Sequence, residues 1–175
     1  MQKILKYSLL FFAIGIGITF LCAFIFNPEQ AQGFRDMVNA KLKHHIPTIE
    51  TKDLEPLLKS KKIQLLDTRE PEECMVSYID GAVMVGYNHF SSYMLSGLDK
   101  NKPVVVYCSV GVRSEKIGEK LVKLGFKDVR NLFGGIFAWS MENRPLTNSK
   151  GKTDKVHPYS SKWSKWLPQE KISYE

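Results

Sequence analysis

One segment of the chain combines a nucleophile with an anion-binding loop. Cys108 ends a run of β-branched residues, and four residues separate it from Arg113: Ser109, Val110, Gly111 and Val112. The helix dipole and unpaired backbone N–H groups stabilise a thiol at a helix N-terminus as the thiolate. Gly111 permits backbone conformations that turn successive N–H groups toward an anion. We therefore predict that Cys108 is a nucleophile and that Arg113 supplies a fixed positive charge beside it.

An alternating pattern of strands and helices would position this cysteine. Short apolar runs predict strands at 63–67, 82–85, 104–107 and 129–132, and helical spacing of apolar residues predicts helices through 54–58, from 71 onward, through 117–124 and at 136–141. This order predicts an α/β fold with a mostly parallel central sheet and helices on both faces. Ligands bind at the carboxyl ends of the strands in such sheets, and Cys108 follows one of those ends.

Five segments, in the same order along the chain, resemble the rhodanese family. They are Leu65 to Glu73, Tyr78 to Ala82, Val104 to Cys108, the Cys108 to Arg113 loop, and Gly134 to Trp139. The resemblance covers about Thr48 to Leu146 and implies a rhodanese-like fold with sulfurtransferase activity. In that family the cysteine takes the outer sulfur of a small anionic donor such as thiosulfate, becomes a persulfide, and passes the sulfur to cyanide or a thiol. The resemblance implies no cofactor and no metal.

The family's functional positions can be carried over to this chain one by one. Cys108 would be the nucleophile and the persulfide carrier, and the backbone of Ser109 to Arg113 would hold the persulfide and the departing anion. Arg113 would bind the anionic donor.

Three residues before the second predicted helix are expected to support the site. Asp67 and Arg69 match the family's Asp-x-Arg signature, and we favour for them an ion pair that ties the loops after two strands together. Glu70 is the candidate partner of Arg113. Cys74 is interpreted as a core residue, with a resolving thiol for Cys108 as the alternative.

Two other functions fit the same general pattern. One is a cysteine-dependent phosphatase or arsenate reductase of the same fold. The phosphatases that resemble rhodaneses place one residue more between the cysteine and the arginine. The shorter loop from Cys108 to Arg113 therefore favours a compact sulfane sulfur over a phosphate. A noncatalytic rhodanese module is the third interpretation, and the presence of Cys108 in an intact loop argues against it.

The N-terminal part of the chain predicts a single membrane-spanning helix. Tyr7–Phe26 is a run of twenty residues without a formal charge, long enough to cross a bilayer. A cleaved signal peptide ending near Ala31–Gly33 is the alternative. Two lysines precede the run, and Arg35 and Lys41 follow it, which favours an extracytoplasmic, periplasmic catalytic domain over a cytoplasmic one.

Length and composition fit one globular domain with extensions. The chain has 175 residues, a net charge of +7 and only three cysteines, which excludes a disulfide-stapled miniprotein. We predict an anchor at 1–26, a juxtamembrane linker with an amphipathic helix at 27–47, a rhodanese domain at 48–146 and a basic C-terminal extension at 147–175. Basic residues on a folded face with stacking aromatics are not evident, so we expect no nucleic-acid partner.

Overall fold

The structure is a computed structural model that describes residues 28–175. The chain divides after Arg35 into two compact units, and the second, Asp36–Glu175, carries the sheet and the candidate site. The run Tyr7–Phe26, for which the sequence predicts a membrane helix, lies outside the described residues. Within residues 28–175, none of the helices combines the length and the apolar character needed to cross a membrane.

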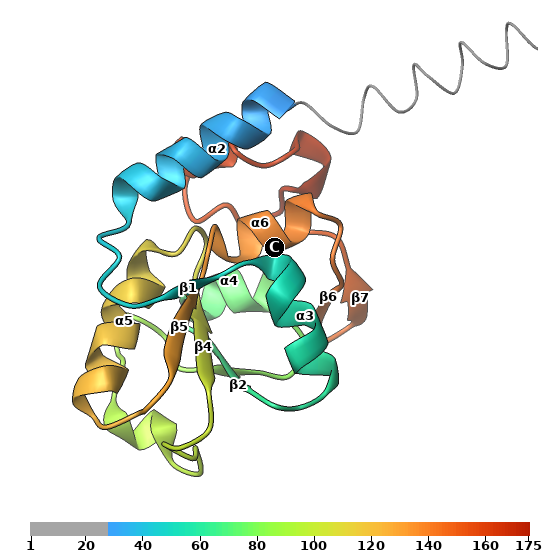
Figure 1. The fold of residues 1–175 in the computed structure, drawn as a ribbon. Coiled ribbons are helices and arrows are strands. Elements are labelled where there is room, and N and C mark those ends of the chain that lie inside the picture. The colour runs from blue at the N-terminus through green and yellow to red at the C-terminus, as the bar shows by residue number, and fades with distance from the viewer. Residues whose placement is uncertain (1–27) are drawn as a thin grey trace, which may run out of the picture. The chain divides into compact units, whose positions relative to one another are not determined.

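A five-stranded parallel sheet forms the centre of the second unit (Figure 1). Its strand order is β1-β5-β4-β2-β3, with β1 at Thr48–Ile49, β2 at Gln64–Asp67, β3 at Ala82–Met84, β4 at Val104–Tyr107 and β5 at Val129–Leu132. The central strand β4 is β-branched at three of its four positions and is fully buried on both faces, as parallel strands covered by helices require. The predicted α/β fold with a mostly parallel sheet is confirmed, and β1 is an addition to it.

Helices cover both faces of this sheet. They are α3 (Thr51–Lys59), α4 (Pro71–Val76), α5 (Val112–Lys123) and α6 (Gly135–Met141), with a short 3₁₀ helix η1 at Ser92–Leu95. Figure 1 shows α5 on one side of the sheet and α3 and α6 on the other. Apolar residues at helical spacing on α5, such as Ile117 and Leu121, pack with alternate residues of β4, Val104 and Val106, in one buried cluster.

Local sequence explains where two of these helices begin and end. Pro71 stands at the start of α4, where its fixed φ suits the helix and its missing N–H costs nothing. Gly125, with φ at +92°, follows the last turn of α5. Pro56 lies in the second turn of α3, beyond the first turn where a proline is usually tolerated. The helix accepts it at the loss of one backbone hydrogen bond.

The segment before the sheet is held by α5. The helix α2 spans Pro28–Lys41, within the linker for which an amphipathic helix was predicted. After it, Glu115 of α5 accepts hydrogen bonds from the backbone N–H groups of Lys43 (2.9 Å) and His45 (3.0 Å). Ile46 joins the core cluster beneath α5. The end of the predicted linker is therefore part of the packed domain.

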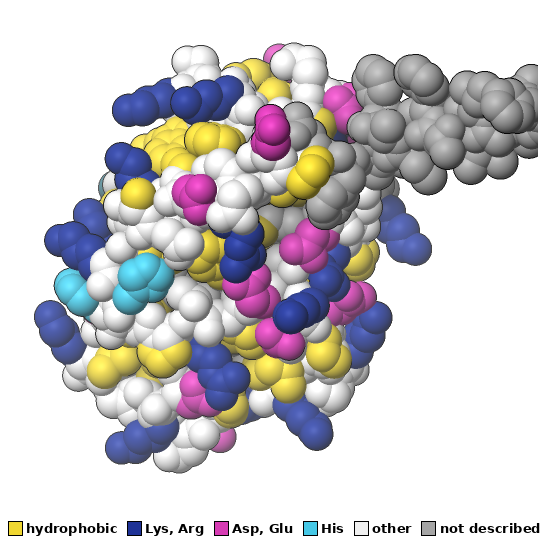
Figure 2. Space-filling model, turned by 45° about the horizontal axis from the view of Figure 1, so that its top comes forward, with side chains coloured by type: hydrophobic (Ala, Val, Ile, Leu, Met, Phe, Trp, Pro, Cys, Tyr) yellow, Lys and Arg dark blue, Asp and Glu magenta, His cyan; other side chains and the backbone are white. Residues whose placement is uncertain are grey.

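The C-terminal residues, for which the sequence predicts only a basic extension, form ordered elements. They comprise the antiparallel hairpin β6 (Leu146–Asn148) and β7 (Gly151–Thr153), the short helix α7 (Ser161–Ser164) and the 3₁₀ helix η2 (Gln169–Lys171). Backbone hydrogen bonds between Tyr78 and Thr147, at 2.8 and 3.0 Å, join the hairpin to the segment after α4. On the face drawn in Figure 2, Lys and Arg side chains are spread around the surface, with acidic side chains among them.

Candidate active site

Cys108 lies at the junction that the sequence predicts. It directly follows β4, and α5 begins four residues later at Val112. Gly111 takes φ +106° before the helix, a conformation that L side chains rarely adopt, and its N–H donates to Cys108 Sγ at 3.2 Å. A backbone donor at the start of α5 is therefore aimed directly at the sulfur.

Helix α6 fixes the first half of this loop from behind. The N–H of Ile136 donates to the carbonyl of Cys108 at 2.9 Å, and the N–H of Phe137 donates to the carbonyl of Ser109 at 3.1 Å. Gly135 makes this approach possible, because a Cβ there would stand 2.2 Å from the Cys108 carbonyl oxygen. The Gly-Gly turn therefore lets the start of α6 approach the cysteine loop closely and hydrogen-bond its carbonyls.

Asn131 fixes the second half of the loop from β5. Its Nδ2 donates to the carbonyl of Gly111 at 2.9 Å, and its Oδ1 accepts from Ser114 Oγ at 2.7 Å. The side chain is fully buried. The sequence did not single out this residue, although a buried asparagine between the apolar residues Val129 and Leu132 was the available signal.

Arg113 is bound to Glu73, and not to Glu70 as the sequence suggested. Its Nη1 and Nη2 each donate to a carboxylate oxygen of Glu73 at 2.7 Å, and Nη2 also donates to Ser109 Oγ at 2.9 Å. Ser109 Oγ in turn donates to Glu73 at 2.8 Å. Glu70 precedes the first turn of α4, and its carboxylate accepts from the backbone of Asn88. Hydrogen bonds from Arg113 and Ser109 to Glu73 thus join α4 to the cysteine loop.

This ion pair keeps both partners charged. Burial alone would raise the pKa of the Glu73 carboxyl, but the hydrogen bonds from Arg113 and Ser109 hold it below its ordinary value. Burial likewise opposes the charge on Arg113, yet Glu73 and the nearby Cys108 raise the pKa of the guanidinium. The site therefore contains a permanent cation beside the sulfur, already paired with a permanent anion.

Asp67 and Arg69 form the ion pair that the sequence predicts, but within one loop. Arg69 Nη2 donates to Asp67 at 2.6 Å and to the carbonyl of Ser77 at 2.6 Å, and both charged side chains are fully buried. Thr68 between them makes the link between loops, since its Oγ1 donates to the carbonyl of Tyr107 at 3.0 Å. These residues support the carboxyl ends of β2 and β4 and do not line the pocket over Cys108.

A pocket of about 180 Å³ opens above the sulfur. The loop and the start of α5 supply five of its lining residues and the C-terminal segment supplies two: Cys108, Ser109, Val110, Val112 and Arg113, then Tyr159 and Trp163. The sequence singled out the first five. Nothing in its pattern connected the two aromatic residues with the loop, because they are distant in sequence and follow the family domain.

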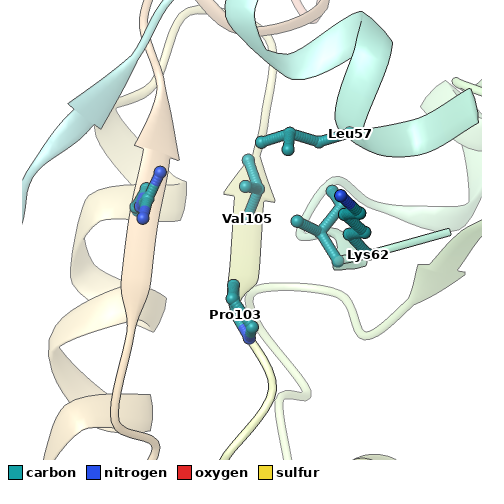
Figure 3. A pocket seen from close by; sticks show the side chains of 6 residues that line it. Leu57, Lys62, Pro103 and Val105 are labelled. Atoms are coloured by element: carbon teal, nitrogen blue, oxygen red, sulfur yellow. The ribbon is translucent and has the colours of Figure 1, made fainter. Parts of the chain in front are cut away.

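A larger cavity, of about 380 Å³, lies at the other end of the sheet (Figure 3). Leu57 of α3, Lys62, and Pro103 and Val105 at the start of β4 line it, together with Ile63 and Arg130. This lining contains no thiol, hydroxyl or carboxylate, so the smaller pocket at Cys108 is the one equipped for chemistry. Residues 28–175 contain no group of three or more His, Cys, Asp or Glu side chains that could hold a metal ion.

Cys74, the other cysteine of the described residues, is chemically quiet. Its side chain is buried, and burial together with the neighbouring Asp67 carboxylate raises the pKa of the thiol to about 12. A thiol of this kind is protonated at neutral pH and is a poor nucleophile. This favours the interpretation of Cys74 as a core residue over a resolving thiol.

Comparison with known families decides the relationship that these features suggest. The model of the Rhodanese-like domain matches residues 50–142, more than half of the chain, and includes β2, β4, the Cys108 loop and α6. The chain belongs to the rhodanese-like domain family. The cysteine loop therefore occupies its place within a known family domain, while the C-terminal segment with Tyr159 and Trp163 lies beyond the matched range.

Individual relatives of this rhodanese-like protein carry sulfurtransferase names. It is 36% identical over 100 residues to the probable adenylyltransferase/sulfurtransferase MoeZ of Mycobacterium tuberculosis. This match covers 56% of this chain and 26% of that protein. It is 34% identical over 83 residues to the thiosulfate sulfurtransferase GlpE of Coxiella burnetii, covering 47% of this chain and 77% of the relative. The chain thus spans about a quarter of the length of the mycobacterial protein.

The fold has counterparts among solved structures. The crystal structure of the BH2092 protein from Bacillus halodurans superposes with a TM-score of 0.55 at 26% identity, over 71% of this chain and 89% of that one. A thiosulfate sulfurtransferase from Pseudomonas aeruginosa, 22% identical over 78% of this chain and 26% of that chain, shares the fold with a TM-score of 0.55.

Proposed function

We propose that this protein is a sulfurtransferase that moves sulfane sulfur from thiosulfate or a related donor to a thiol or cyanide acceptor, through a persulfide on Cys108. The observation that carries the proposal is the position of Sγ: it lies at the N-terminus of α5, accepts the Gly111 N–H at 3.2 Å and borders a pocket. The sulfurtransferase names of two relatives support the same reaction class.

The first half-reaction loads the enzyme. The Cys108 thiolate attacks the outer sulfur of thiosulfate, a new S–S bond forms, and the original S–S bond breaks so that sulfite leaves with the electron pair. The Gly111 N–H next to Sγ, with the rest of the loop backbone, then stabilises the charge of the terminal persulfide sulfur. No external oxidant or reductant enters this step, because one S–S bond is exchanged for another.

The second half-reaction returns the cysteine to its starting state. Cyanide or the thiolate of an acceptor attacks the outer sulfur of the persulfide, and the Cys108 thiolate departs. With cyanide the product is thiocyanate, and with a thiol it is the acceptor's persulfide.

We assign Arg113 a role in orienting the anionic donor. Because Glu73 already binds both terminal nitrogens of its guanidinium, the local net charge is small. The backbone of Ser109 to Arg113 therefore contributes the main donors for the leaving anion, and Arg113 fixes that backbone through Ser109.

Thiocyanate formation from thiosulfate and cyanide tests the proposal. The full-length protein should turn over, Cys108→Ser should abolish turnover, and Cys74→Ser should retain it, because the Cys74 thiol is buried and protonated. Equal thiocyanate production by Cys108→Ser and the unmodified protein would disprove the assigned nucleophile.

The spacing of the loop favours this activity over phosphate-ester hydrolysis. Four residues separate Cys108 from Arg113, and the single charged residue that lines the pocket is already ion-paired. A loop one residue shorter than that of the phosphatases forms a narrower cradle, which fits a compact sulfane sulfur better than a phosphate. Hydrolysis of aryl phosphates faster than sulfur transfer by the unmodified protein would favour the phosphatase.

We propose further that Tyr7–Phe26 anchors the protein in a membrane with the catalytic domain outside the cytoplasm. The support is the uncharged run of twenty residues and the lysines that precede it. Protease added to intact spheroplasts should digest the domain and leave a membrane-bound fragment. Digestion only after lysis would place Cys108 in the cytoplasm, and a soluble product starting near Phe34 would indicate a cleaved signal.

A further inference from the structure

The C-terminal segment, residues 156–172, is fastened to the domain where it starts and where it ends. The Val156 N–H donates to the carbonyl of Lys171 at 2.7 Å, and the Ser173 N–H donates to the carbonyl of Val156 at 3.2 Å. Lys171 Nζ donates to Asn143 Oδ1 at 2.7 Å and to the carbonyl of Ser140, at the end of α6. Val156 is fully buried. The segment is therefore a closed loop docked on the domain.

Two aromatic residues in the middle of this segment reach the candidate active site. The Tyr159 ring lies against the guanidinium of Arg113, with 4.3 Å from Cζ to the ring centroid. Tyr159 has φ +64°, which is rare for a residue with a bulky side chain, and its N–H donates to His157 Nδ1 at 3.0 Å. Trp163, on α7, completes the lining on the same side. A backbone conformation of this kind persists only where its surroundings fix it.

The resulting pocket is mostly apolar and carries little net charge. Val110 and Val112 from the loop face it together with the two aromatic residues. Arg113 is the single charged residue of the lining, and both of its terminal nitrogens already donate to Glu73. Such a surface stabilises an apolar group by burial and offers no unpaired cation to a dianion.

We propose that Tyr159 and Trp163 determine donor specificity, selecting sulfane-sulfur donors that carry an apolar group, an aryl group above all, over inorganic thiosulfate. This inference rests on the sulfurtransferase function proposed above. The pocket holds about 180 Å³, and a cavity of about 150 Å³ is known to accommodate benzene. A single ring beside Sγ therefore fits the space between the loop and the C-terminal segment.

The chemistry of such a donor is the same as that of thiosulfate. In an arenethiosulfonate the Cys108 thiolate attacks the terminal sulfur, a new S–S bond forms, and the bond from that sulfur to the sulfonyl sulfur breaks. The arenesulfinate leaves with the electron pair, and the same Cys108 persulfide remains. The aryl ring would lie against Trp163 and Tyr159 while the sulfonyl oxygens face the loop N–H groups.

A matched pair of donors tests the proposal on the full-length protein. Benzenethiosulfonate and methanethiosulfonate have the same reacting group and differ in the apolar substituent. Cyanide is the acceptor, and kcat/KM is measured for each donor. Dividing it by the rate constant of the same donor with a free thiol removes the difference in intrinsic reactivity between the two donors. The unmodified protein should prefer the phenyl donor by about tenfold or more, the discrimination expected for burying several additional carbons.

Variants of two tryptophans locate the source of that preference. Trp163→Ala should reduce the preference to near unity through a higher KM for the phenyl donor, and Trp163→Phe should retain most of it. Trp166→Ala is the control, because this tryptophan lies three residues away in the same segment and does not line the pocket.

The outcomes separate this inference from the proposed function. Equal use of both donors by the unmodified protein, or an unchanged preference in folded Trp163→Ala, would overturn the specificity role and leave sulfur transfer intact. The donor comparison on the unmodified protein decides the matter if Trp163→Ala proves unfolded in a melting experiment. Absence of sulfur transfer from every donor would overturn the proposed function itself.

Discussion

Arg113 holds the carboxylate of Glu73 with two hydrogen bonds of 2.7 Å, one from each terminal nitrogen. The pair connects α4 with the first turn of α5 across the base of the cysteine loop, and the Glu73 side chain is only 3% exposed. An ion pair buried to this extent is both an electrostatic element of the site and a structural link.

Removing the cation should destabilise the protein. Arg113→Ala leaves the buried Glu73 carboxylate without its partner, which costs about 3–5 kcal/mol of the free energy of unfolding. Adding Glu73→Gln to this variant should recover part of the loss, because no uncompensated charge remains. Urea unfolding of the single and double variants measures both effects, and an Arg113→Ala protein as stable as the unmodified one would contradict the structural role.

The same pair predicts a loss of stability in acid. The folded-state pKa of Glu73 lies below its ordinary value of 4.5, so the unfolded chain binds more protons in that range. This contribution to stability is fully present above pH 4.5 and is lost as the pH falls through the lower, folded-state pKa. Glu73→Gln should flatten the profile of unfolding free energy below that pH, whereas the exposed neighbour Glu72→Gln should not.

Gly135 should tolerate no side chain. An added Cβ would lie 2.2 Å from the carbonyl oxygen of Cys108, and φ is +55°. Gly81→Ala is a matched control, because Gly81 has φ +77° with nothing within 4 Å. The control should lose about 1–2 kcal/mol from backbone strain alone. Gly135→Ala should lose a further ~1–3 kcal/mol from overpacking.

Displacing the loop at Gly135 should also affect catalysis. A shift of Sγ by about 1 Å costs roughly a hundredfold in rate. Thiocyanate formation should therefore fall in Gly135→Ala and remain near normal in Gly81→Ala. Full activity in Gly135→Ala would show that the contact between α6 and the loop does not position the sulfur.

Asn131 should act as a positioning residue for the loop. Asn131→Ala leaves the Gly111 carbonyl and the Ser114 hydroxyl without this partner, at a cost of about 1–3 kcal/mol. Asn131→Asp retains an acceptor for Ser114 and removes the donor to Gly111, so a fall in kcat at constant KM in this variant isolates the effect on the loop. Asn101→Ala, at an exposed position, controls for the general effect of the substitution.

Most of the fold follows from local sequence. The β-branched run at 104–107 predicts β4, because a strand that is buried on both faces is apolar throughout. The apolar spacing at Ile117 and Leu121 predicts α5, because this helix buries one face. The two-residue strand β1 carries no such periodicity, and its pairing with β5 is a property of the assembled sheet. The hairpin β6–β7 is polar apart from the buried Leu146, and its other strand residues are half-buried or exposed, so hydrophobic patterning gives no signal for it.

The site was predictable where its residues are neighbours in sequence. Cys108, Gly111 and Arg113 share one turn, and their types alone indicate an anion-binding thiol. Glu73 lies 40 residues before Arg113 and Tyr159 lies in the C-terminal segment, yet both contact Arg113. Which of two nearby glutamates faces Arg113 depends on the helical phase of α4, and that phase is set by packing.

Mass spectrometry of the full-length protein after exposure to thiosulfate or benzenethiosulfonate, without acceptor, tests the persulfide on Cys108 most directly. We expect one added sulfur atom, located by peptide mapping on Cys108, absent from Cys108→Ser and removed by cyanide. Cys74→Ser should load to the same extent as the unmodified protein. Failure to find the added sulfur with either donor, or its location on a residue other than Cys108, would contradict the persulfide mechanism.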